Sequence, residues 1–264
     1  MKLGIMQPYF YPYIGYWQLM NLVDEYVIAD DVQYIKNGFI NRNKILINGE
    51  GQYFRIPVHK PSQNKLICEH ETSFDEAEIE KMLSTLKSAY AKAPNYEKVA
   101  AHVREVLEFG LTEDGKKLSL FLENAIKLTA RELGITTPIK LKSRDIILDG
   151  EYKREHYVVA ICKATEATEY YNAIGGTKLY YQSFFRENGL GLKFVHTNDV
   201  MYQQFGSQFV PNLSVLDMMM FCSQEQITEF LNACCLEDGY ESEEEMLSKQ
   251  DPELSVNLVA CHQG

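Results

Sequence analysis

The sequence has no apolar run long enough to cross a bilayer and no leader-like start. About 18–20 consecutive apolar residues are needed to span the hydrocarbon core. After Met1 and Lys2, only a short apolar stretch precedes Gln7. We therefore expect no signal peptide and no membrane insertion, and we predict a cytoplasmic protein.

The sequence also lacks the local motifs of several enzyme and metal-site classes. The six cysteines form no C-x-x-C pair and have no ligand-like histidine spacing, so we predict reduced thiols and no zinc site. No G-x-S-x-G, Walker or G-x-G-x-x-G sequence is present. These absences argue against a serine hydrolase, a P-loop enzyme and a dinucleotide oxidoreductase.

Positive charge is scarce overall but locally concentrated. The chain has 264 residues, with 26 Lys and Arg against 37 Asp and Glu, which gives a net charge of −11. Residues 237–253 supply −7 of it, whereas residues 36–65 have a local balance of +5. The sequence therefore predicts no duplex nucleic-acid partner and does not favour a tRNA. A small anionic substrate such as a nucleotide-sugar stays compatible with the basic segment.

The hydrophobic pattern predicts an α/β fold that opens with a β-α-β unit. Residues 2–6 and 26–29 are typical of strands, with a helical pattern between them. Asn48-Gly49 predicts a β-hairpin turn, and residues 74–134 read as a helical insertion. Beyond it, short strands are expected at 146–148, 169–171 and 192–195, and helices at 152–164 and 177–187. We predict one domain over 1–235 and an acidic extension over 236–264.

Capping patterns locate several helix starts. Ser73-x-x-Glu76 predicts the start of the first inserted helix. The patterns Ser214-x-x-Asp217 and Ser223-x-x-Gln226 predict the starts of two late helices.

The loop after the first strand is the first candidate binding element. It offers Gln7, Tyr9, Gly15 and Tyr16 at the carboxyl end of a strand and the start of a helix, where α/β proteins bind ligands. The segment resembles the strand–loop–helix of nucleotidyltransferases with an H-x-G-H motif, but tyrosines occupy the histidine positions. Tyrosine carries no positive charge at neutral pH. The alternative is an aromatic loop that only packs.

Two carboxylates follow the second strand. Asp30 and Asp31 could bind a divalent ion, orient a ribose hydroxyl or act as a base on an amine. The alternative is that Asp30 caps a turn and Asp31 is exposed. On the hairpin, Asn41 and Arg42 place an amide beside a guanidinium suited to phosphate or carboxylate.

Four further residues complete the candidate site. His59 lies at a strand end within the basic segment and is a candidate proton acceptor, with Lys60 beside it as an anion ligand. Gly175 and Gly176 form a turn between a strand and a helix that could hold a ligand. A lone histidine is more often structural, and a Gly-Gly pair is a weak signal.

Taken together, these blocks resemble the WbqC-like protein family of bacterial O-antigen gene clusters. The resemblance covers most of the chain up to about residue 235. It rests on Gln7-Pro8-Tyr9, Pro12, Gly15-Tyr16, Asp30-Asp31-Val32-Gln33-Tyr34, Asn41-Arg42, Ile56-Pro57-Val58, Ile161-Cys162-Lys163-Ala164, Tyr171, Gly175-Gly176, and the blocks Tyr202 to Phe209, Pro211, Leu213-Ser214 and Asp217.

The resemblance implies an aminoacyl transferase, for example a glycyl transferase, that acts on an amino sugar or nucleotide-linked amino sugar. In that interpretation Arg42 and the hairpin cations bind the anionic substrate, and Asp30 or His59 removes the proton of the amine. The donor would be an activated amino acid, or ATP would activate it, and no cofactor is required by the sequence. A nucleotidyltransferase or ligase and a noncatalytic binding or scaffold protein are the alternatives.

Overall fold

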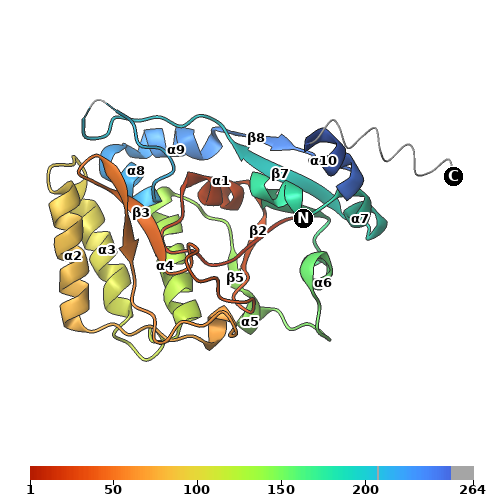
Figure 1. Cartoon of the computed structure of the whole chain (residues 1–264), viewed down its shortest axis with the longest axis horizontal. Coiled ribbons are helices and arrows are strands. Elements are labelled where there is room, and N and C mark those ends of the chain that lie inside the picture. Colours follow the sequence, from red (N-terminus) through yellow and green to blue (C-terminus); the bar gives the residue numbers. More distant parts are fainter. Residues whose placement is uncertain (207, 251–264) are drawn as a thin grey trace.

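The computed structural model describes residues 1–206 and 208–250 of the chain. Figure 1 shows a twisted central sheet, with a group of helices at one end and shorter helices at the other. The α/β class predicted from the sequence is confirmed. Within the described residues, no helix is both long and apolar enough to cross a membrane.

The chain opens with the predicted β-α-β unit. It consists of β1 (Lys2–Met6), α1 (Ile14–Leu22) and β2 (Glu25–Ile28), and the two strands pair in parallel. Gly4 lies directly opposite Tyr26. A Cβ at Gly4 would approach the Tyr26 ring to 2.9 Å, so the glycine allows the tyrosine to pack against the strand.

The main sheet has six strands in the order β5-β2-β1-β6-β7-β8. The added strands are β5 (Ile139–Leu141), β6 (Glu169–Ala173), β7 (Gly191–Thr197) and β8 (Cys234–Glu237). All neighbours are parallel except β7 and β8. The strand predicted at 146–148 is wrong. Residues 139–141 fill the edge beside β2 instead, and Ile147 is 78% exposed.

A hairpin precedes the helical insertion. The strands β3 (Arg42–Ile47) and β4 (Glu50–Arg55) form a separate two-stranded sheet, followed by the short 3-10 helix η1 (Ile67–Glu69). Next come α2 (Glu76–Tyr90), α3 (Tyr96–Phe109) and α4 (Leu118–Leu133), which stand side by side at the left of Figure 1. The cap predicted at Ser73 is wrong, because Asp75 accepts the capping bond from the Glu78 N–H.

The remaining elements are short. They are α5 (Lys142–Asp145), α6 (Arg154–Ala164), the 3-10 helix η2 (Ile174–Lys178), α7 (Gln182–Glu187), α8 (Val215–Phe221), α9 (Gln224–Asn232) and α10 (Glu243–Gln250). The helix predicted over 177–187 is divided, because Tyr181 has an extended backbone between η2 and α7. Ser214 caps α8, and Ser223 with Gln226 forms the predicted capping box of α9.

The acidic C-terminal segment begins inside the fold. Its predicted start at residue 236 falls within β8, which pairs with β7. The Gln182 N–H then bonds the Tyr240 carbonyl, and Met246 of α10 is buried near Tyr181. The described part of the segment is therefore anchored on β7 and α7. Residues 251–264 of the predicted extension lie outside the described residues.

Two hydrophobic cores cover the two faces of the main sheet. Tyr26 and Ile28 of β2 face the larger core, which continues through α1 into the inserted helices. Leu3, Ile5 and Val27 face the smaller core, which contains α6 and α7. Successive strand side chains point to opposite faces, so this alternation fixes the face that each helix covers.

Candidate active site at the carboxyl ends of the strands

The strand order places a topological switch point between β1 and β6. From β1 the chain proceeds to β2 and β5 on one side, and it returns to β6 and β7 on the other. Tyr16 of α1 lies in the larger core and Phe185 of α7 in the smaller, so the helices after β1 and β6 cover opposite faces. Ligands of open α/β sheets bind at such a point, at the carboxyl ends of the strands. Gln7 and the turn at Gly175 follow the two strands that flank it.

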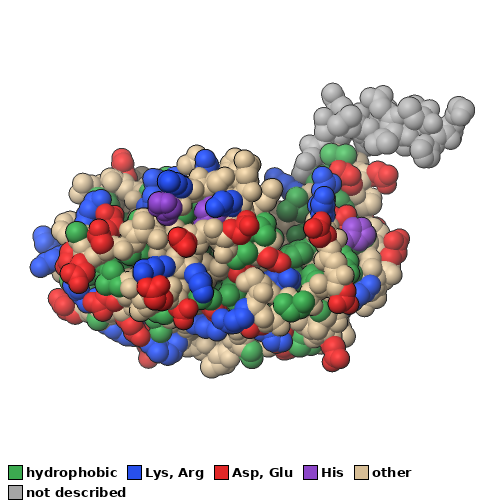
Figure 2. Space-filling view, turned by 90° about the horizontal axis from the view of Figure 1, so that it is seen from below, with side chains coloured by type: hydrophobic (Ala, Val, Ile, Leu, Met, Phe, Trp, Pro, Cys, Tyr) green, Lys and Arg blue, Asp and Glu red, His purple; other side chains and the backbone are tan. Residues whose placement is uncertain are grey.

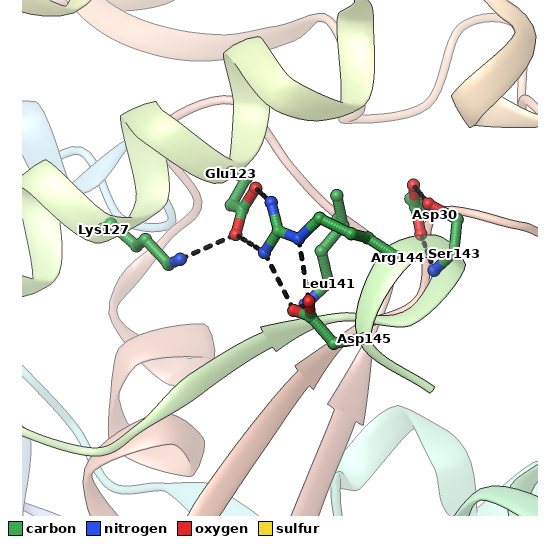
Figure 3. Close-up of polar contacts among 7 residues, drawn as sticks. All are labelled: Asp30, Glu123, Lys127, Leu141, Ser143, Arg144 and Asp145. Atoms are coloured by element: carbon green, nitrogen blue, oxygen red, sulfur yellow. Dashed lines mark hydrogen bonds and ion pairs between the residues drawn. The ribbon is translucent and has the colours of Figure 1, made fainter. Parts of the chain in front are cut away.

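Asp30 follows β2 at this edge of the sheet and is completely buried. One carboxylate oxygen accepts a hydrogen bond from the Ser143 N–H at 2.9 Å, and the other accepts from the Ser143 hydroxyl at 2.6 Å. Burial raises the pKa of Asp30, and the Ser143 hydrogen bonds oppose the shift. Asp30 therefore attaches the start of α5 to the end of β2, as Figure 3 shows.

Asp31 differs from its neighbour because its side chain is partly open to solvent. It is 24% exposed and lies 2.7 Å from the Lys142 ammonium, whose side chain is only 7% exposed. The Tyr157 hydroxyl of α6 donates to its other oxygen. Asp31 is thus a carboxylate at the sheet edge that two donors from separate helices orient, and we call Asp31, Lys142 and Tyr157 the Asp31 triad.

Tyr157 of the Asp31 triad and the neighbouring Cys68 are both held in their protonated forms. Burial, then the hydrogen bond to Asp31, raises the pKa of Tyr157, so the phenol serves as a donor. Burial, then the charges of Asp30 and Asp31, raises the pKa of Cys68 to about 11. A thiol with that pKa is a poor nucleophile at neutral pH, so Cys68 is not a candidate nucleophile.

A network of charged groups fixes α5 from the other side (Figure 3). Arg144 makes two hydrogen bonds of 2.8 Å to the Glu123 carboxylate of α4, and two more to Asp145. Lys127 donates to Glu123 at 2.7 Å. Bidentate guanidinium–carboxylate pairs combine strength with fixed geometry. The network therefore holds Lys142 and Ser143 against the two aspartates.

The first loop is mostly packed. Tyr16 is 1% exposed, and its hydroxyl donates to the Gln7 carbonyl at 3.2 Å. A Cβ at Gly15 would meet the Tyr13 ring at 2.6 Å and the Thr197 hydroxyl at 2.7 Å. Gly15 and Tyr16 thus contribute to the packing of α1. Side chains of Tyr13 and Thr197 already occupy the space beside Gly15. Gln7 and Tyr9 are only half-buried and stay available at the edge.

The hairpin residues contribute to their own loop as well. Arg42 donates to the Gly38 carbonyl at 3.1 Å and to the Asn37 carbonyl, and its guanidinium stacks 4.1 Å from the Tyr53 ring centroid. Asn41 donates to the Ile56 carbonyl across the hairpin. Both side chains are partly exposed. They stabilise the turn that contacts the first loop through the Phe39 carbonyl and the Phe10 N–H.

Among the residues that the structure describes, His59 and Lys60 make no hydrogen bond or ion pair with Asp30 or Asp31. The His59 N–H bonds the Glu71 carbonyl, whereas the Cys68 N–H bonds the Asp30 carbonyl. His59 and Asp30 thus contact different residues of the segment around η1. Both side chains are exposed. The structure does not bring His59 into contact with the Asp31 triad.

The two glycines of η2 play different parts. A Cβ at Gly176 would meet the Asn172 amide at 2.5 Å, so this glycine is required for packing. Gly175 is exposed and open, with nothing within 4 Å of a Cβ placed there. Of these two glycines, Gly175 is the one that borders free space at the switch point.

Sequence reasoning missed Lys142, Ser143 and Tyr157. The signal for the first two was present, because Lys142 and Ser143 follow directly on β5 at the same sheet edge as Asp30. The misplaced strand at 146–148 concealed it. Tyr157 lies within the predicted helix at 152–164, but only the tertiary contact with Asp31 distinguishes it from other helical tyrosines.

The fold and these contacts define an α/β protein with a polar site at the carboxyl edge of a parallel sheet. The family model described as "WbqC-like protein family" matches residues 7–229, and the chain belongs to this family. It is also 26% identical over 236 residues to "Uncharacterized protein Rv1507c" of Mycobacterium tuberculosis. That alignment covers 88% of this chain and 98% of the relative. No solved structure matches the chain.

Proposed function

We propose that this protein is an acyl transferase that attaches an aminoacyl group, such as a glycyl group, to the amine of an amino sugar or nucleotide-linked amino sugar. We place this reaction in the cytoplasm, in the synthesis of a surface polysaccharide such as an O-antigen. Membership of the WbqC-like family supports the proposal. The observation that carries it is the partly exposed Asp31, held between Lys142 and Tyr157 at the ligand-binding edge of the sheet.

The reaction requires a base for the amine and donors for the developing oxyanion. The sugar nitrogen forms a bond to the acyl carbon, the bond from that carbon to the activating group breaks, and the amine proton leaves. Asp31 is the proposed acceptor of this proton. Lys142 and Tyr157 are the donors closest to it, so either can turn toward the carbonyl oxygen as charge develops there. Asp30, with both oxygens bonded to Ser143, is a positioning residue rather than a base.

Five of the other sequence-predicted residues are assigned to substrate binding. Gln7, Tyr9 and Gly175 border the switch point, and Arg42 with Lys60 supplies positive charge on the neighbouring hairpin segment. The face in Figure 2 has acidic and basic side chains interspersed, without a broad field of one sign. This face therefore offers no broad basic footprint of the kind that a nucleic-acid duplex needs.

The nucleotidyltransferase alternative is less well supported by the first loop. In the H-x-G-H comparison, Tyr16 occupies the position of the last histidine, but it is buried and bonded to the Gln7 carbonyl. It is therefore not directed at a nucleotide. The scaffold alternative leaves the orientation of Asp31 by two donors without a purpose.

The test is a transfer assay with purified protein. Nucleotide-linked amino sugars are incubated with glycyl-tRNA, a glycyl thioester, or glycine with ATP, and mass spectrometry detects the acylated sugar. Product formation that Asp31→Asn abolishes and Asp114→Asn preserves would support the proposal. Asp114 is a matched control because its side chain is 71% exposed on the helical insertion. Failure of all three donors with a broad sugar panel, or an Asp31→Asn variant as active as the parent, would overturn it.

A further inference from the structure

A cluster of three potential metal ligands lies on the paired strands β7 and β8, away from the Asp31 triad. His196 is directly opposite Cys235 in the antiparallel register, and Glu237 is two residues farther along β8 on the same face. One ligand atom from each of the three side chains lies within 4.8 Å of the other two. Diagonal neighbours on one face of a sheet are within reach of long side chains, which accounts for the approach of Glu237.

The three side chains offer the mixture of donor atoms that Zn²⁺ binds. Imidazole nitrogen, thiolate sulfur and carboxylate oxygen are its ordinary protein ligands, and a site with three of them leaves the fourth position for water or another ligand. The His196 Nδ1 already contacts the Glu237 carboxylate. Cys235 is a free, exposed cysteine. All three side chains are accessible, so an ion can enter without opening the fold.

The simpler explanation is an exposed ion pair between His196 and Glu237. Such a pair is about half exposed on both sides, with side-chain exposures of 50% and 45%, and pairs of this kind contribute little to stability. An ion pair gives no role to Cys235, whereas a metal ion explains the convergence of all three groups. The neighbouring acid Asp238 is already paired with Lys193.

We propose that His196, Cys235 and Glu237 bind one Zn²⁺ ion, with a water molecule or an anion in the open position. The cluster lies at the carboxyl end of β7, whose partner β6 leads into the turn at Gly175. The site is therefore on the same edge of the sheet as the switch point but at separate residues. The proposal is independent of the transferase activity. Local sequence spacing gave no indication of it, because the ligands meet only through strand pairing.

Cobalt titration of the full-length protein tests the proposal. Co²⁺ reports thiolate ligation by a charge-transfer absorption and tetrahedral geometry by its visible bands, and Zn²⁺ is then added to displace it. We expect one equivalent of Co²⁺ with a thiolate band, and displacement by one equivalent of Zn²⁺. The titration is done with a phosphine reductant so that the thiols stay reduced. Affinity should fall at acid pH, because metal binding requires a deprotonated thiol and a neutral imidazole.

The variants assign the ligands. Cys235→Ser should remove the thiolate band, and His196→Ala and Glu237→Gln should each weaken binding by at least the roughly 10- to 100-fold that loss of an outer-shell partner costs. Cys234→Ser is the matched control, since Cys234 precedes Cys235 on the opposite face of β8 and its sulfur contacts the Leu231 carbonyl. Circular dichroism confirms that each variant is folded. Absence of one-equivalent binding, a thiolate band that survives Cys235→Ser, or equal loss in Cys234→Ser would overturn the proposal.

Discussion

Two aspartates of this protein, Asp30 and Asp217, are equally buried but have different surroundings. Asp30 and Asp217 are both 0% exposed, and burial raises the pKa of each. Asp217 accepts hydrogen bonds from Tyr90 at 2.7 Å, Tyr202 at 2.8 Å and Gln204 at 2.6 Å. In the described part of the chain, no Lys or Arg pairs with Asp217.

The partners of each cluster indicate its role. Asp217 lies on α8, and its partners come from α2 and from the segment before α8, so the hydrogen bonds of this sealed carboxylate join distant segments of the chain. Asp30 instead adjoins Asp31, which is partly exposed and has a cation within 2.7 Å. A sealed carboxylate with neutral donors is suited to holding segments of the chain together. An open carboxylate with a cation and a phenol is suited to proton transfer.

The largest effect should follow from Asp31→Asn. Loss of a general base costs about 10²–10⁴-fold in rate, and we expect a fall of that order in kcat for aminoacyl transfer. The melting temperature should also fall, because one amide oxygen cannot serve both Lys142 and Tyr157 and the nearly buried ammonium loses its counter-charge, but kcat of the folded protein should fall far more. Steady-state kinetics beside a thermal melt measure both. Loss of activity that merely parallels loss of folded protein would contradict the assignment of proton transfer to Asp31 and of a structural role to Asp217.

Asp217→Ala should have the largest effect on stability. It leaves the Tyr90 and Tyr202 hydroxyls and the Gln204 amide without their acceptor, and each unsatisfied buried group costs about 1–3 kcal/mol. We expect a loss of roughly 2–5 kcal/mol in the free energy of unfolding, measured by urea denaturation. Asp217→Asn, which keeps one acceptor oxygen, should lose less. A change within about 0.5 kcal/mol, as is usual for surface substitutions, would show that Asp217 does not hold these segments together.

Glu123→Gln should have an intermediate effect because it loosens α5 without touching the Asp31 triad. The substitution removes the charge that binds Arg144 and Lys127. Since Arg144 is about half exposed, solvent screening limits the expected loss to about 1 kcal/mol. Activity should fall by less than in Asp31→Asn. Glu105→Gln is the control, as Glu105 pairs with Arg131 in a mostly exposed contact of 3.6 Å, and it should leave both quantities unchanged.

The smallest expected effect is a pH dependence from His102. Burial lowers the pKa of His102 below its ordinary 6.5, so the folded protein keeps this imidazole neutral while the unfolded chain protonates it. Stability from this group is therefore present above about pH 6.5 and is lost as the pH falls through that value toward the lower folded pKa. Melting curves of the parent and His102→Gln between about pH 7.5 and pH 5 should converge at acid pH. A stability difference between parent and variant that stays constant over this pH range would contradict the prediction.

Much of the fold followed from local patterns, and part of the candidate site did as well. The strands at residues 2–6 and 26–29, the turn at Asn48-Gly49 and the inserted helices are encoded within short windows, and the structure has all of them. The edge strand is the exception. The run at 146–148 has the more strand-like composition, but the vacant position beside β2 is filled by residues 139–141. A window of sequence cannot compare two competing segments for one edge.

The candidate site was also predicted only in part from the sequence. The sequence indicated Asp30 and Asp31, because carboxylates after a strand of a β-α-β unit lie at the ligand-binding edge. It did not indicate which of the two is open, because that depends on Ser143 and Lys142 more than 110 positions away. It also assigned Gly15 and Tyr16 to binding, whereas packing around Tyr13 and the Gln7 carbonyl accounts for both.

The hydrophobic periodicity by itself determined the α/β class and the position of the two aspartates at the end of a strand, and the local balance of +5 in residues 36–65 gave the prediction of a compact anionic substrate. The tertiary structure decided which aspartate meets a lysine and a tyrosine, which one is sealed, and where His196 meets Cys235. The reason is physical. Secondary structure follows from neighbours three or four residues apart, whereas the charge, burial and ligand set of a side chain depend on segments brought together only when the sheet forms.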